Sequence, residues 1–113
     1  MSFASIRKVV PYGAPERELG SFYALHEDCS SSGQAIVRIS VPPGHGAASV
    51  REESSYPHYR EDNPRVLCNA HAVPGTVVYY APAPGYAGRD SLVVDVIFPD
   101  GGNWQRRYDI IVK

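Results

Sequence analysis

Two cysteines are the first residues of this chain whose chemistry depends on their spacing. Cys29 and Cys68 stand alone, with no CxxC motif of the kind that holds a metal or forms a redox pair. A disulfide between them would close a loop of about 40 residues and stabilise the fold by ~4 kcal/mol through the entropy of the unfolded chain. We therefore expect a Cys29–Cys68 disulfide, with two reduced thiols in a cytosolic protein as the alternative.

Histidines and carboxylates are the other groups that bind metals. The four histidines, none of them in an HxH or HxxxH pair, are His26, His45, His58 and His71. His58 and His71 share one polar segment with Glu61 and Asp62, and these side chains would bind a metal only if the fold brought them together. We expect no metal site and no cofactor, and a metal site in this segment is the alternative.

Sequence patterns for hydrolytic catalysis are missing. The chain has no Gly-x-Ser-x-Gly motif. The acidic pairs Glu52-Glu53 and Glu61-Asp62 are adjacent in sequence, so an extended chain points the two members of each pair to opposite sides. A general acid and a general base must instead converge on one substrate. We expect a protein that is not an enzyme, and a small hydrolase would need a Ser-His-carboxylate set or paired carboxylates brought together by folding.

One long segment, 53–72, is polar and aromatic and has no clear strand pattern. Structureless loops of this length are uncommon in compact domains and are usually functional or disordered. Pro57 and Pro64 restrict the unfolded chain, and a bonded Cys68 would anchor the far end, so an ordered loop is expected. Ordered loops on rigid scaffolds are where binding usually resides. The predicted binding residues are Tyr56, His58, Tyr59, Arg60 and Arg65.

Length and composition limit the class of protein. The chain has 113 residues, enough for one domain over 1–113, and its content of 43% hydrophobic and 20% charged residues is globular. A net charge of −1 provides no basic field for nucleic acid, and no apolar run approaches the ~20 residues that span a membrane. The 8 Tyr, 10 Gly and 10 Pro favour half-buried strands joined by tight turns, and so an all-β protein.

Alternation of apolar and polar residues predicts seven strands. They are Ser5–Val10, Gly20–His26, Ile36–Val41, Ala47–Glu52, Thr76–Ala81, Ser91–Phe98 and Gln105–Val112. Their number and spacing indicate an antiparallel sandwich of two sheets. The predicted core residues are Val37, Ile39, Val78, Tyr80, Leu92, Val94, Val96, Tyr108 and Ile110. Trp104, near the tip of the last hairpin, either contacts a partner or covers the end of the core, and the sequence leaves both open.

Residues 73–113 follow a more specific pattern. A strand ends in Tyr-x-Pro, a corner follows with the pattern Pro-Gly-aromatic-x-Gly-x-Asp-Ser, and an alternating hairpin turns at Asp-Gly. The residues that match are Tyr80, Pro82, Pro84, Gly85, Tyr86, Gly88, Asp90, Ser91, Asp100 and Gly101, with Pro43, His45, Gly46 and Val50 before an earlier strand. We expect Tyr86 to lie over the end of the core and Asp90 to accept hydrogen bonds from the backbone of the corner. The stretch resembles the end of bacterial Ig-like and cadherin-like repeats.

The resemblance implies a non-enzymatic structural or adhesion-type module of a bacterial envelope or secreted protein. Its location would be periplasmic or extracellular, with a secretion signal removed, and its partner would be a protein or a component of the cell envelope. The alternative is a ligand- or metal-binding domain that uses the loop 53–72. No nucleic acid and no membrane insertion are expected, and the sequence does not determine the oligomeric state.

The chain departs from the family pattern in two places. Residues 27–30, Glu-Asp-Cys-Ser, stand roughly where the repeats often have an Asn-Asp-x-Asp cluster that serves calcium, which weakens the case for calcium here. The segment 53–72 replaces a turn that the repeats keep short.

Overall fold

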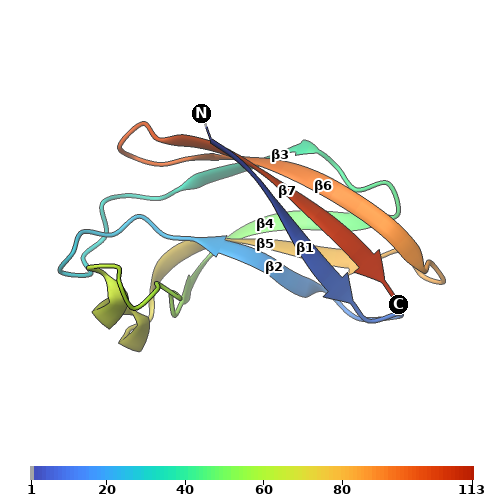
Figure 1. Ribbon diagram of the computed structural model, residues 1–113, viewed down its shortest axis with the longest axis horizontal. Coiled ribbons are helices and arrows are strands. Elements are labelled where there is room, and N and C mark those ends of the chain that lie inside the picture. The colour runs from blue at the N-terminus through green and yellow to red at the C-terminus, as the bar shows by residue number, and fades with distance from the viewer. Residues whose placement is uncertain (1) are drawn as a thin grey trace.

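The computed structural model describes residues 2–113, which form seven strands and one short 3₁₀ helix. The strands are β1 (Ser2–Val10), β2 (Arg17–Phe22), β3 (Ile36–Val41), β4 (Gly46–Ser55), β5 (Val73–Pro82), β6 (Gly88–Ile97) and β7 (Asn103–Val112), and the helix is η1 (Val66–Ala70). One sheet has the order β1-β7-β6-β3 and the other the order β2-β5-β4. The sheets pack face to face (Figure 1), so the predicted all-β sandwich is confirmed. The orders β2-β5-β4 and β3-β6-β7 are those of strands B-E-D and C-F-G in an immunoglobulin sandwich.

The first strand departs from the predicted antiparallel arrangement, because β1 runs parallel to β7. Residues pair in register from Ser2 with Trp104 to Val10 with Val112. A tight turn cannot join parallel neighbours. Here the rest of the sandwich separates the two strands in sequence, since the chain crosses to the other sheet after Val10 and enters β2 at Arg17.

The core lies between the sheets and takes alternate residues from each strand. Eight of the predicted core residues are buried, namely Val37, Val78, Tyr80, Leu92, Val94, Val96, Tyr108 and Ile110. Ile39 is half-buried and packs against them. Val41, predicted on the same face as Val37, is exposed, because a bulge between Ile39 and Val41 shifts the register against β6.

The second strand begins and ends earlier than the predicted range 20–26. A bulge between Glu18 and Gly20 breaks the simple alternation, so Leu19 and Phe22 both reach the core. The Tyr108 hydroxyl fills the space that a side chain at position 20 would occupy, and the residue there is Gly20. Residues 23–26 leave the sheet, and their apolar members are buried in the loop that follows.

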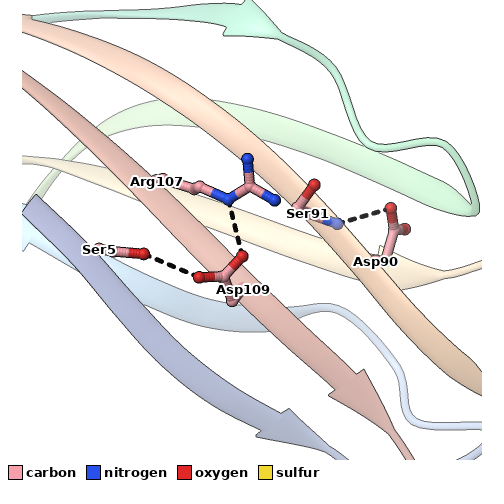
Figure 2. Close-up of polar contacts among 5 residues, drawn as sticks. All are labelled: Ser5, Asp90, Ser91, Arg107 and Asp109. Carbon is pink, nitrogen blue, oxygen red and sulfur yellow. Dashed lines mark hydrogen bonds and ion pairs between the residues drawn. The ribbon is translucent and has the colours of Figure 1, made fainter.

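Asp90 lies where three segments meet, at the end of the sandwich where the chain enters β6. Its carboxylate accepts hydrogen bonds of 2.8 to 3.0 Å from the backbone N–H groups of Gly44, His45 and Ser91 and from the Tyr80 hydroxyl. Figure 2 shows the bond from Ser91. The predicted corner is confirmed, and because Tyr80 belongs to β5 and Asp90 to β6, it also links the two sheets.

The turn before Asp90 is shaped by Tyr86 and Gly88. The Tyr86 ring stacks on His45 with centroids 4.1 Å apart and packs against the edge of the core, as predicted. Gly88 has φ +135°, a backbone conformation that side chains rarely adopt, and a Cβ there would lie 3.1 Å from the Tyr86 hydroxyl.

We predict that Asp90→Asn lowers the free energy of unfolding by about 2–3 kcal/mol, because an amide cannot accept all of these bonds and loses their charge assistance. Tyr80→Phe should cost about 1 kcal/mol, and the double variant should lose less than the sum, since the two groups are partners. Urea unfolding measures all three. Asp95→Asn is the matched control, because Asp95 lies on the same strand and accepts no side-chain hydrogen bond within residues 2–113. An equal loss in the control would contradict the role of Asp90.

Two buried phenols should make the fold sensitive to alkali. Burial raises the pKa of Tyr80, and the Asp90 carboxylate raises it further. Burial also raises the pKa of Tyr108, against the opposing effect of Arg106. An unfolded phenol has a pKa of about 10, so the stability linked to these phenols is present below about pH 10 and is lost as the pH rises above it. The free energy of unfolding, measured with urea at a series of pH values, should therefore fall as the pH rises above about 10, and the fall should be smaller in Tyr80→Phe. An unchanged fall in that variant would argue against this linkage.

Candidate functional site

One end of the sandwich collects three loops that are far apart in sequence. They are the β2–β3 loop (23–35), the β4–β5 loop (56–72) and the β6–β7 turn (98–102). Figure 1 shows them together, opposite the end at which β7 finishes. Loops on a rigid scaffold are frequent binding sites, and antibody variable domains place their B–C and F–G binding loops at one end in the same way.

The insertion is shorter than the predicted 53–72. Glu53–Ser55 continues β4 and pairs with residues 73–75 of β5, so the loop itself is 56–72. Along this ladder the Tyr79 hydroxyl donates to the Glu53 carboxylate, and both side chains are half-buried. The remaining loop is ordered by Asn69, whose side chain accepts from the Tyr59 N–H at 2.8 Å and donates to the Tyr59 carbonyl at 2.9 Å.

Two bonds tie the β4–β5 loop to the β2–β3 loop. Cys29 and Cys68 form the predicted disulfide, with Cα atoms 5.4 Å apart. The Arg65 Nε donates to the Leu25 carbonyl at 2.7 Å. Cys68 is fully buried in a small apolar cluster with Leu25 and Val73, separate from the main core. The two loops therefore form one unit beside the sandwich.

A groove lies between these joined loops and the β6–β7 turn, and we call it the loop groove. It consists of two adjoining hollows of about 470 and 220 Å³, and both are lined by Tyr23, Tyr59, Phe98 and Trp104. The charged or titratable side chains along it are His26, His58, Arg65, Asp100 and Arg106. Its volume is in the range of sites for small ligands, about 300–1,000 Å³.

Trp104 and Arg106 are held in place by other rings. Trp104 meets Phe98 edge to face with centroids 5.0 Å apart, and 40% of Trp104 is exposed. The Arg106 guanidinium carbon lies 4.9 Å from the Phe22 centroid and 5.7 Å from the Trp104 centroid. A cation is attracted to the face of a ring, so both rings orient this guanidinium. Its Nε is shielded from solvent and makes no hydrogen bond of normal geometry within residues 2–113.

The charges along the loop groove are mostly of one sign. Arg65 and Arg106 are permanently cationic, and Asp100 at the hairpin tip is the one acidic residue among the described residues that line it. Asp100 accepts a hydrogen bond from the Gly102 N–H at 2.8 Å. Burial raises the pKa of the Tyr59 phenol, and the neighbouring Arg65 opposes the rise, so the phenol stays protonated at neutral pH.

The structure brings together part of the predicted binding set. His58, Tyr59 and Arg65 line the loop groove. Tyr56 is 55% exposed and Arg60 is exposed beside Asp62, 3.7 Å away, and neither lines the groove.

The lining residues that were not predicted as binding residues include Tyr23, Phe98, Arg106 and Trp104. Trp104, for which the sequence left two roles open, is a partly exposed groove residue that packs on Phe98. In the sequence, the only indication of a binding role for Trp104 is that it is the single Trp of the chain and stands beside two arginines. That it lies across the groove from the β4–β5 loop depends on the topology and cannot be seen in the sequence.

The metal alternative finds no ligand set in the described part of the chain. Within residues 2–113, no three side chains among His, Cys, Asp and Glu lie close enough together to hold an ion. His58, His71, Glu61 and Asp62 are all exposed on the loop. These four side chains therefore do not come together as a metal site in this segment would require.

Another hollow, of about 580 Å³, lies on the outer face of β1, β7 and β6. Arg7, Arg89 and Arg107 line it. Asp109 lies between the strands and accepts from the Arg107 Nε and the Ser5 hydroxyl, each at 2.7 Å (Figure 2). These two contacts hold the pKa of Asp109 below its usual range. Among the described residues lining this hollow there is no Phe, Tyr or Trp, so the loop groove is the better candidate for recognition.

Comparisons with protein-family models, with curated proteins and with solved structures find no match to this chain. Within residues 2–113, no helix has the length and apolar character that crossing a membrane requires.

We predict that the double variant Cys29→Ala, Cys68→Ala lowers the free energy of unfolding by about 4 kcal/mol, because the unfolded chain regains loop entropy. In the folded variant, amide hydrogen exchange should quicken in residues 23–35 and 56–72 while the centres of β6 and β7 remain protected, since the disulfide joins loops and not sheets. Loss of protection throughout both sheets would show that the bond supports the sandwich itself.

Proposed function

We propose that this chain is a non-enzymatic, adhesion-type binding module, an Ig-like domain of a bacterial envelope or secreted protein that takes its ligand in the loop groove. The observation that supports the proposal is the meeting of three separate loops around the rings of Tyr23, Tyr59, Phe98 and Trp104. Aromatic side chains bury a large area and lose little rotamer freedom, which is why recognition surfaces are rich in them.

Binding rather than catalysis is supported by the chemistry of the groove. Proton transfer requires an acid and a base that converge on the substrate. Here the permanent cations are Arg65 and Arg106, Asp100 is bonded to the backbone of its own turn, and His26 and His58 line different hollows of the groove. Fixed cations and rings hold a ligand without changing it.

The disulfide supports a periplasmic or extracellular location. Disulfides persist in oxidising compartments and are rare in the reducing cytosol. The resemblance of residues 73–113 to bacterial Ig-like and cadherin-like repeats supports a bacterial source and an envelope or secreted protein. A component of the cell envelope or another protein is then the partner to test first.

We predict that a ligand perturbs backbone amide resonances at the loop groove. The ¹⁵N-labelled protein is titrated with muropeptides, wall teichoic acid, lipopolysaccharide core oligosaccharide, and acidic and neutral polysaccharide fragments. At least one should shift residues 23–26, 57–65 and 98–106, because these line the groove. His58→Ala should weaken that binding, whereas Arg60→Ala, an exposed residue of the same loop outside the groove, should not. Shifts confined to the outer face of β1, β7 and β6, or no shift with any fragment, would refute the proposal.

A further inference from the structure

We infer that the ligand of the loop groove is an acidic saccharide, with sugar carboxylates against Arg65 in one hollow and Arg106 in the other, and a sugar ring against Trp104, which lines both. The inference rests on the proposed function and adds the class of ligand.

Positive charge exceeds negative charge among the side chains of the loop groove. The whole chain has a net charge of −1, yet the described residues that line the loop groove include two arginines, two histidines and one carboxylate. Complementary potential favours an anionic ligand in such a groove.

The two arginines are already oriented. The Arg65 Nε is bonded to the Leu25 carbonyl, and the Arg106 guanidinium lies over the Phe22 ring. Within residues 2–113, neither guanidinium forms an ion pair with a carboxylate. A planar guanidinium that is held in place and unpaired suits the two oxygens of a carboxylate, and little entropy is lost when they meet.

The rings of the groove provide flat surfaces for a sugar. Trp104 is 40% exposed and is fixed edge to face on Phe98, while the backbone that carries the Tyr59 ring is held by Asn69. The face of an aromatic ring is weakly negative, so it attracts the weakly positive C–H groups on one side of a pyranose ring. The phenols and imidazoles nearby offer donors and acceptors to the hydroxyl groups.

The backbone around the groove has little to offer a peptide. Peptide recognition usually draws on main-chain hydrogen bonds. At this site the Ala24 carbonyl accepts from Ser32, the His26 N–H donates to the Ser30 carbonyl, and both backbone groups of Tyr59 are bonded to Asn69. The Phe98 N–H and carbonyl are bonded to Gly102 and Gly101 across the hairpin turn. Recognition is left to side chains, which favours an acidic saccharide over an acidic peptide.

The test uses galacturonic acid oligomers and isothermal titration calorimetry on the intact protein. The oligomer should bind. Its methyl-esterified form of equal length should bind with an affinity lower by a factor of about ten or more, because an ester cannot form charge-assisted bonds. Raising the salt from about 50 to about 300 mM should weaken binding of the acid form more than that of the ester. Equal affinity for acid and ester would overturn the carboxylate assignment.

Variants connect this binding to the groove. Trp104→Ala should abolish measurable binding and Trp104→Phe should retain part of it, because a phenyl ring keeps a flat face. Arg65→Gln should weaken binding of the acid oligomer and leave binding of the ester unchanged. Arg89→Gln, in the hollow on the outer face, is the matched control and should leave the affinity unchanged. If Arg65→Gln disturbs the loop, seen as widespread shifts in its amide spectrum, the comparison of acid and ester on the unaltered protein still decides the question.

The outcomes separate this inference from the proposed function. A glutamate-rich peptide or a neutral saccharide that binds in the groove better than the uronate would overturn the ligand class and leave the binding module in place. Uronate binding that survives Trp104→Ala but is lost in Arg89→Gln would overturn the site as well.

Discussion

The hydrogen bond from the Tyr80 hydroxyl to the Asp90 carboxylate fixes one end of the sandwich, and the position of the other end depends on it. Tyr80 lies in the central strand of the three-stranded sheet and Asp90 at the start of β6 in the other. The same carboxylate holds the turn that leads into β4. From this corner the β4–β5 and β6–β7 ladders run without a break to the opposite end. Because the register is constant, the β4–β5 loop and Trp104 emerge at set positions, and the groove between them has a defined width.

The loop end is held by a second set of contacts with a different character. The Thr76 hydroxyl donates to the Ala35 carbonyl at 2.7 Å in a buried position and so ties β5 to the end of the β2–β3 loop. The disulfide and the Arg65–Leu25 bond then join that loop to the insertion. The disulfide and the Arg65–Leu25 bond lie outside the main core, to which Ala35 belongs. A long polar loop of this kind contributes little apolar burial of its own, so covalent and polar ties replace the packing that orders the sheets.

The sequence predicted those features that depend on local pattern. Alternation located all seven strands and most of the core, and the residues around Asp90 predicted its corner because an Asp after a Pro-Gly turn needs backbone donors. The bulges in β2 and β3 were not visible, since one extra residue changes the face of the residues that follow it and leaves composition and hydrophobicity unchanged. The parallel pairing of β1 was missed for a related reason. Whether a strand runs parallel or antiparallel to its neighbour is decided by where the chain crosses between the sheets. The alternation of apolar and polar residues within the strand is the same in either case.

The candidate site was predicted only in part, because it is assembled from three loops. The segment around His58, Tyr59 and Arg65 was recognisable by its length and its aromatic and basic content. Tyr23 and Phe98 look like ordinary strand residues in the sequence, and nothing in the order of residues shows that they face the same space. Their convergence follows from strand order, which the tertiary packing of the whole chain determines.

The parallel pairing of β1 with β7 also affects how the molecule would respond to tension. The strands begin together at Ser2 and Trp104 and end together at Val10 and Val112, so the first strand starts at one end of the sandwich and the last strand finishes at the other (Figure 1). A pull on those two ends acts along the ladder, in shear, and strains its hydrogen bonds at the same time instead of opening them one after another from a tip. Resistance to such a force is a matter of the unfolding rate and not of equilibrium stability. A module with this geometry would keep its sandwich closed under a mechanical load that would readily peel a terminal hairpin apart.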